Sequence, residues 1–137
     1  MTPSDLQIRR MNSFLLIAER ELRAASLLGK ELPEQAAYFL QQAIEKLIRA
    51  LLEFEGIPMG VGHNLRALAD QLPADHAFAG RFRQFDDLSV ASTRYRYPIS
   101  EGRLLNFDPR QLPALLESVT HLNDEISQHL RTKISQK

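Results

Sequence analysis

Apolar residues recur every three or four positions over long stretches of the chain, which is the spacing of helices that bury one face. The first stretch predicts a helix from about residue 3 to 28, closed by Gly29. The second begins at Pro33 and ends at Gly56. Its apolar positions form a face wide enough to pack on two sides, which predicts a central place in the fold or a partner surface: Ala36, Phe39, Leu40, Ala43, Ile44, Leu47, Ile48 and Leu51.

Capping residues indicate where the predicted helices begin. Thr2 and Pro3 offer an N-cap and a first helical residue for the first helix. Asn64 can cap a short third helix, Asp75 a fourth and Asp108 the last. The fourth would bury Phe78, Phe82, Phe85, Leu88 and Ala91, and the last Leu112, Leu115, Val119, Leu122, Ile126 and Leu130.

These elements predict an all-α fold, an up-and-down bundle of about five helices in one domain over residues 1–130. Residues 131–137, RTKISQK, are expected to form a frayed basic tail. The composition agrees, because Leu and Ala together number 36 and the β-branched Val, Ile and Thr only 15 among 137 residues. The chain has no Cys, no secretory signal and no apolar run of the roughly 18 residues that span a membrane, so we expect a cytoplasmic protein.

Charge changes this picture only locally. Lys and Arg number 17 and so do Asp and Glu, and a net charge of zero argues against a general nucleic-acid binder. Between residues 94 and 103, however, three Arg stand against one Glu, and two of the three Tyr of the chain lie beside them. Any anion site is therefore expected to be small and confined to this segment.

The segment 94-RYRYP-98 combines the side chain types that bind nucleotides. Arg94 and Arg96 can each bind a phosphate through paired N–H donors, and Tyr95 and Tyr97 can stack on bases. We therefore predict nucleotide or RNA contacts from these four residues. The alternative is structural: Tyr95 packs into the core and the two arginines pair with acids of a neighbouring helix.

A polar row on the second helix is another candidate site. Gln42, Glu45, Lys46 and Arg49 are three or four residues apart and share one face. Lys46 and Arg49 lie beside the apolar stripe, where they are predicted to contact a ligand phosphate or a partner. In the alternative, the row is a solvated face on which Glu45 pairs with Arg49. We expect Glu45 to position a basic side chain and not to act as a general base, because it stands between two cations.

The histidines offer weaker candidates. His63 follows a glycine and precedes a helix, where an imidazole can face an anion, exchange a proton near neutral pH or simply fix the loop. His121, Glu125 and His129 fall at four-residue steps, but the outer two are two turns, about 12 Å, apart and cannot close on one metal ion. We therefore predict no metal site. We also predict no cofactor, because Gly60-Val61-Gly62 lacks the preceding strand and the Gly-Lys-Ser/Thr ending of a phosphate loop.

Several stretches resemble the HEPN domain, a small helical domain named for its occurrence in higher eukaryotes and prokaryotes and for nucleotide binding. The stretch 36-AAYFLQQAIEKLIRALLEFEG-56 is similar to the second helix of that family, with its Gln-Gln-Ala and Glu-Lys pattern. His63-Asn64-Leu65 and 94-RYRYP-98 follow in the order and spacing of the prokaryotic branch. The resemblance covers residues 4 to 130.

The resemblance implies a five-helix bundle that usually forms a homodimer. It also implies a function drawn from RNases, toxins of toxin–antitoxin pairs and domains that partner small nucleotidyltransferases. The catalytic members of the family carry an Arg followed, after four to six residues, by a His that serves metal-independent RNA cleavage. None of the four His of this chain has an Arg at those positions, which argues against a nuclease of that kind.

We therefore expect a nucleotide- or RNA-binding module, or a nucleotidyltransferase partner, in which Lys46 and Arg49 join the 94–97 segment. The alternative is an RNase or toxin that uses a displaced His63 together with Arg94. A third possibility is a purely structural interaction domain to which nothing small binds.

Overall fold

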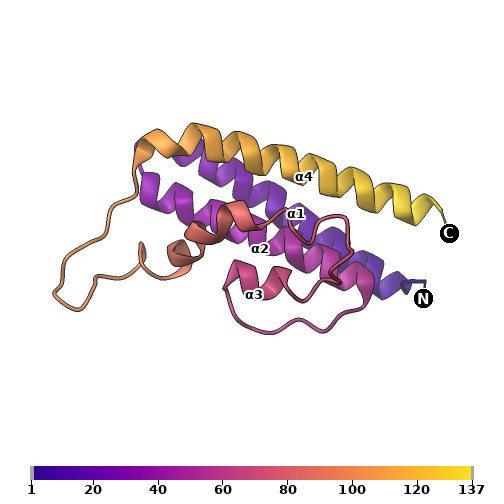
Figure 1. Cartoon of the computed structure of the whole chain (residues 1–137). Helices are drawn as coiled ribbons and strands as arrows, with labels where there is room; N and C mark the ends of the chain where they lie inside the picture. Colours follow the sequence, from indigo (N-terminus) through magenta and orange to yellow (C-terminus); the bar gives the residue numbers. More distant parts are fainter. Residues whose placement is uncertain (1, 137) are drawn as a thin grey trace.

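The computed structural model describes residues 2–136, and every regular element among them is helical. Three long helices lie side by side along the molecule: α1 (Asp5–Leu28), α2 (Pro33–Glu55) and α4 (Leu112–Ser135). Figure 1 shows α1 antiparallel to α2, and α4 pointing in the same direction as α2. Both ends of the chain therefore lie at the same end of the bundle.

Between α2 and α4 the chain returns along the bundle through α3 (Leu65–Ala69) and the 3-10 helix η1 (Arg83–Ser92), and the short η2 (Pro109–Gln111) leads into α4. Four α-helices and η1 correspond to the five predicted helices, so the predicted all-α bundle is confirmed.

The first helix begins later than its predicted cap. Ser4, and not Thr2, is the N-cap: its hydroxyl accepts the backbone N–H of Gln7 at 3.1 Å, and the Gln7 side chain accepts the backbone N–H of Ser4 at 2.7 Å. This reciprocal capping box satisfies two N–H groups that the first turn leaves free, whereas a cap at Thr2 would satisfy at most one. Gly29 ends α1 with a φ of 54°, as predicted.

The second helix is central, which its wide apolar face predicted. α1 packs along one side of α2, and α4, α3 and η1 pack against the rest. The apolar positions from Ala36 to Leu52 are buried among these elements, except Tyr38 and Phe39, which are half-buried. Gly56 ends the helix in the left-handed region, with a φ of 70°, where glycine is favoured. Packing within one chain thus accounts for the apolar stripe, which no longer supplies an argument for a dimer.

The predicted fourth helix is wrong in type and in its starting point. Residues 73–82 form turns, and η1, a 3-10 helix, covers only Arg83–Ser92. Its buried residues explain the difference, because Phe82, Phe85, Leu88 and Ala91 are spaced by three. A step of three places successive side chains directly above one another in a 3-10 helix, whereas an α-helix needs steps of three and four.

The last helix is longer than expected. Asp108 accepts the backbone N–H of Arg110 at 3.0 Å and so caps η2, which continues into α4. The helix extends to Ser135, so residues 131–135, expected in a frayed tail, are helical, and Ile134 packs against the core. Lys137 lies outside the described residues.

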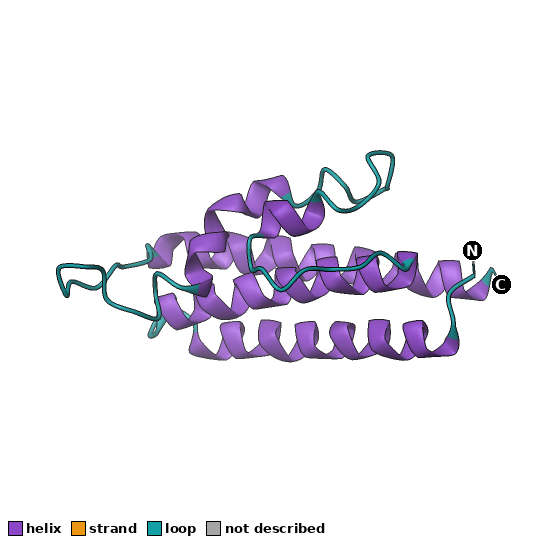
Figure 2. Ribbon diagram, turned by 90° about the horizontal axis from the view of Figure 1, so that it is seen from below, coloured by secondary structure: helices purple, strands orange, loops and turns teal. Residues whose placement is uncertain are grey.

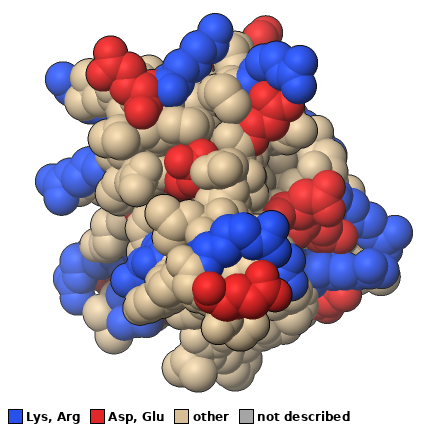
Figure 3. All heavy atoms as spheres, turned by 90° about the vertical axis from the view of Figure 1, so that its left-hand side faces the viewer, with Lys and Arg blue, Asp and Glu red and all other residues tan. Residues whose placement is uncertain are grey.

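Residues 93–108, the projecting loop, extend beyond the bundle at the end opposite to the chain termini (Figures 1 and 2). The loop closes at its tip, where the N–H of Ile99 donates to the carbonyl of Arg103 at 2.9 Å and Gly102 has a φ of 81°. Its base is tied to α2, because the N–H of Phe107 donates to the Glu34 carboxylate at 2.9 Å. Seen from this end, basic and acidic side chains lie next to one another with wide uncharged areas between them, so no large basic surface forms here (Figure 3).

Candidate functional site

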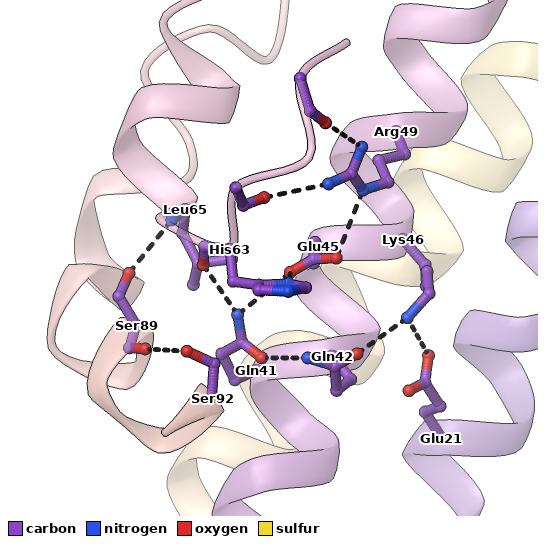
Figure 4. A network of polar contacts seen from close by, with 12 residues as sticks. Glu21, Gln41, Gln42, Glu45, Lys46, Arg49, His63, Leu65, Ser89 and Ser92 are labelled. Atoms are coloured by element: carbon purple, nitrogen blue, oxygen red, sulfur yellow. Dashed lines mark hydrogen bonds and ion pairs between the residues drawn. The ribbon is translucent and has the colours of Figure 1, made fainter. Parts of the chain in front are cut away.

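The polar row on α2 points into the molecule and forms a network around Glu45 (Figure 4). The Glu45 side chain is only 4% exposed. One carboxylate oxygen lies 2.9 Å from Nδ1 of His63, and the other accepts a hydrogen bond from Nε of Arg49 at 3.3 Å. Because an ionised carboxylate only accepts hydrogen bonds, His63 carries a proton on Nδ1 in this arrangement. Gln41 adds a longer contact of 3.4 Å.

Arg49 and Gln41 fasten the loop after α2 to the helix. The two terminal nitrogens of Arg49 donate to the carbonyls of Gly60 and Gly62 at 2.9 and 3.0 Å. Gln41 donates to the carbonyl of His63 at 3.0 Å. The Arg49 side chain is 11% exposed, and each of its three guanidinium nitrogens donates a hydrogen bond, Nε to Glu45 and the terminal two to the loop (Figure 4).

Lys46 connects α2 to α1 instead of facing solvent. Its ammonium donates to Glu21 at 3.2 Å and to the side-chain oxygen of Gln42 at 3.1 Å. Burial raises the pKa of the Glu21 carboxyl above its ordinary value, although Lys46 opposes the shift. We call this set the Glu45 network: Glu21, Gln41, Gln42, Glu45, Lys46, Arg49 and His63.

The aromatic and basic residues at the start of the projecting loop gather elsewhere. The guanidinium of Arg96 lies over the ring of Tyr38, 5.0 Å from its centroid, and over the ring of Tyr97 at 5.5 Å. Tyr97 is 59% exposed. Arg94 is exposed, and within residues 2–136 neither Arg94 nor Arg96 forms an ion pair or a side-chain hydrogen bond. The structural alternative, in which both arginines pair with acids, is therefore wrong.

Tyr95 is the member of the segment that turns inward. Its ring meets that of Phe107 edge to face, with 6.0 Å between centroids, and packs against the core. Burial first, and then the charge of Glu34, raise the pKa of the Tyr95 hydroxyl, while Arg94 opposes the shift. The structural alternative holds for Tyr95. We call the whole set the Arg–Tyr cluster: Tyr38, Arg94, Tyr95, Arg96 and Tyr97.

The structure thus separates predicted site residues that we expected to act together. The ring of Tyr38 lies under the guanidinium of Arg96. On α2, Tyr38 and Lys46 are eight residues apart, which is about 12 Å along the helix axis. No hydrogen bond or ion pair among the described residues joins the Glu45 network to the side chains of the Arg–Tyr cluster, or His63 to Arg94.

A family model described as the HEPN domain matches residues 11–127. The chain belongs to the HEPN domain family. Neither a curated protein nor a solved structure matches it significantly. Family membership supports, in general terms, a nucleotide- or RNA-related module.

His121 and His129 of this HEPN domain make different contacts. His121 lies 3.0 Å from a Glu125 oxygen, and Arg81 donates to both oxygens of the same carboxylate at 2.9 Å. His129 instead packs edge-on against Phe78, with 5.1 Å between ring centroids. Within residues 2–136, no group of three or more His, Asp or Glu side chains is placed to hold a metal ion, and no helix has both the length and the apolar character needed to span a membrane.

Sequence reasoning missed Tyr38 and Gln41. Tyr38 stands 58 residues before Arg96, and no local spacing links them; the only signal was that it is the third Tyr in a chain that has three. Gln41 was visible as part of the HEPN-like Gln-Gln-Ala pattern, but its role, holding the backbone of the loop before α3, needs the loop to be in place.

Proposed function

We propose that this HEPN domain binds a nucleotide or single-stranded RNA at the Arg–Tyr cluster and does not cleave it. The observation that carries the proposal is the arginine held over two tyrosine rings. The guanidinium carbon of Arg96 lies over the rings of Tyr38 and Tyr97, and among the described residues its N–H donors form no hydrogen bond, which leaves them free for phosphate. The exposed ring of Tyr97 offers a surface for a base, and Arg94 a second phosphate donor.

Lys46 and Arg49 do not enter this proposal as ligand contacts. Two of the three N–H donors of Lys46 bond to Glu21 and Gln42, and three of the five of Arg49 bond to Glu45 and the carbonyls of Gly60 and Gly62. Their role is to hold α1 and this loop on α2.

The test is the affinity of the purified domain for a short single-stranded RNA and for mononucleotides, measured at fixed salt. Replacing Arg96 or Tyr97 with Ala should weaken RNA binding about tenfold or more, because one base stacked on an aromatic ring contributes about 1–3 kcal/mol. Arg83→Ala is the matched control, since Arg83 is exposed on η1 and outside the cluster. Equal affinities for all variants would contradict the proposal.

A second candidate is a metal-independent RNase or toxin that uses His63. The observation in its favour is the 2.9 Å contact with Glu45, which orients the ring by Nδ1 and leaves Nε2 on a side chain that is 57% exposed. Incubation with single-stranded RNA in the presence of a chelator decides between the two. Cleavage that disappears in both His63→Ala and Arg94→Ala would establish the nuclease, and saturable binding without cleavage supports the binding module.

Family membership also suggests partners. We propose a cytoplasmic homodimer that can associate with a small nucleotidyltransferase, as one component of a two-gene pair of the toxin–antitoxin kind. Light scattering at tens of micromolar tests the dimer, and a monomer there would count against it. A nucleotidyltransferase gene beside this one would support the two-component arrangement.

A further inference from the structure

The outer side of α1 is unlike the outer sides of the other long helices. Eight large hydrophobic residues are exposed among residues 2–136, and half of them lie on α1, whereas α2 and α4 carry none. On α1 they are Leu6 at 57%, Leu16 at 46%, Ile17 at 37% and Leu27 at 77% exposure. In Figure 2, α1 forms one edge of the bundle, and no other element lies on its outer side.

The exposed side of α1 also carries a net positive charge, because its exposed arginines are Arg9, Arg10, Arg20 and Arg23 and its exposed acids are Asp5 and Glu19. On a helix with 3.6 residues per turn, Arg9, Arg20 and Leu27 point almost directly away from the buried residues of α1. Within the described residues, only Arg10 of the four forms an ion pair, with Glu53 at 2.9 Å. The centre of the face therefore combines apolar side chains with unpaired positive charge.

The face is also hollowed. A shallow, open cavity of about 260 Å³ lies between the side chains of this one helix and is lined by Arg9, Arg10, Ser13, Phe14 and Ile17. Apolar and basic groups thus line the same depression, which suits a ligand that brings an apolar side chain and a carboxylate together.

We propose that the outer face of α1 docks an acidic amphipathic helix of a partner protein. The 22 residues from Leu6 to Leu27 extend about 32 Å along the axis, which matches a partner helix of similar length. The apolar side chains of such a helix would cover Leu16, Ile17 and the cavity. Its carboxylates would pair with Arg9, Arg20 and Arg23.

A second copy of this chain fits the face less well. If two copies pair antiparallel about Leu16, Arg9 of one copy lies opposite Arg23 of the other, and like charges at an interface are unfavourable. A membrane surface also fits less well, because Arg9 and Arg20 lie in the middle of the apolar face, whereas an interfacial helix separates its basic residues from its apolar side.

The test uses a synthetic helical peptide of about 21 residues with Leu at positions i, i+3, i+4 and i+7 and Glu on the flanking positions, and a twin with Lys in place of each Glu. Binding at near-physiological salt is followed by fluorescence anisotropy, and the contact surface by amide chemical shifts. The acidic peptide should bind in the micromolar range and shift α1 residues, and the Lys twin should bind at least tenfold more weakly.

Variants on the face separate docking from general charge attraction. Arg9→Glu/Arg20→Glu and Leu16→Ser/Leu27→Ser should each weaken binding about tenfold or more. The control is Arg66→Glu/Arg83→Glu, which replaces exposed arginines on α3 and η1. It changes the net charge by the same amount as Arg9→Glu/Arg20→Glu and should leave the affinity for the acidic peptide unchanged. Thermal melts confirm that each variant is folded, since every changed side chain is exposed.

The proposal is overturned if the acidic peptide does not bind, if it binds the face variants as well as the native chain, or if its shifts lie off α1. It is also overturned if the native chain binds anionic vesicles, or dimerises in sedimentation runs, and Leu16→Ser/Leu27→Ser abolishes that binding or dimerisation. RNA affinity should be equal in all these variants, so the outcome is independent of the proposed RNA site.

Discussion

The Glu45 network and the Arg–Tyr cluster both contain arginine, but in opposite environments. In the network, Arg49 meets a carboxylate and two carbonyls, and its side chain is 11% exposed. In the cluster, the Arg96 guanidinium lies over two tyrosine rings, and among residues 2–136 Arg94 forms no ion pair. An arginine whose donors are satisfied stabilises the fold, whereas an exposed one with free donors is available to a ligand. The difference separates the residues that hold the bundle from those that meet a partner.

The largest effect is expected at Glu45. Glu45→Ala leaves the nearly buried Arg49 without its carboxylate and removes the partner of His63 Nδ1, which should lower the free energy of unfolding by about 3 kcal/mol. Urea denaturation measures this change. The control is Glu53→Ala, which removes an ion pair to the half-exposed Arg10 and should cost about 0.5 kcal/mol. Equal losses in the two variants would remove the distinction between the network and an ordinary surface pair.

A smaller effect is expected at Arg96. Arg96→Ala removes contacts with Tyr38 and Tyr97 and should lower stability by about 0.5–1 kcal/mol, because a cation over an exposed aromatic ring contributes about that much. The comparison is with Arg96→Lys, which keeps the charge but loses the planar group that stacks. A stability loss as large as that of Glu45→Ala would mean that the cluster, too, is part of the framework.

The smallest effect on stability is expected at Arg94. Arg94→Ala removes an exposed side chain without ion pairs, so the free energy of unfolding measured by urea denaturation should change by no more than about 0.5 kcal/mol. RNA affinity should nevertheless fall. A variant that lost stability without losing affinity would reverse the roles assigned to the two regions.

The pH dependence of stability tests a group that belongs to neither region. Burial, and then the charges of His76 and Lys133, lower the pKa of His129, while Glu55 opposes the shift. A histidine with a depressed pKa in the folded state is protonated more readily when unfolded, so its contribution is complete above about pH 6.5 and is lost as the pH falls through the folded pKa. His129→Gln should flatten this decline in urea midpoints measured between pH 7.5 and 5. An equally steep decline in the variant would assign the effect to other groups.

Residue spacing was enough to predict the three long helices, the glycine ends of α1 and α2 and the central place of α2, because the spacing shows which face is apolar and the glycines stand where the pattern stops. The type of η1 was missed although its step of three was visible. The polar row on α2 was recognised, but its direction was not, since Lys46 and Arg49 are turned by acids and carbonyls that come from α1, from α2 itself and from a loop. Pairing between distant parts of the chain, such as Tyr38 with Arg96, leaves no local pattern.

The most direct test of the two-region account is the amide chemical-shift map of the domain during titration with a short single-stranded RNA. The account predicts the largest shifts at residues 94–97 and at Tyr38, with those of Glu45, Lys46 and Arg49 little changed. The largest shifts at Arg49 and His63, with none in the projecting loop, would contradict it.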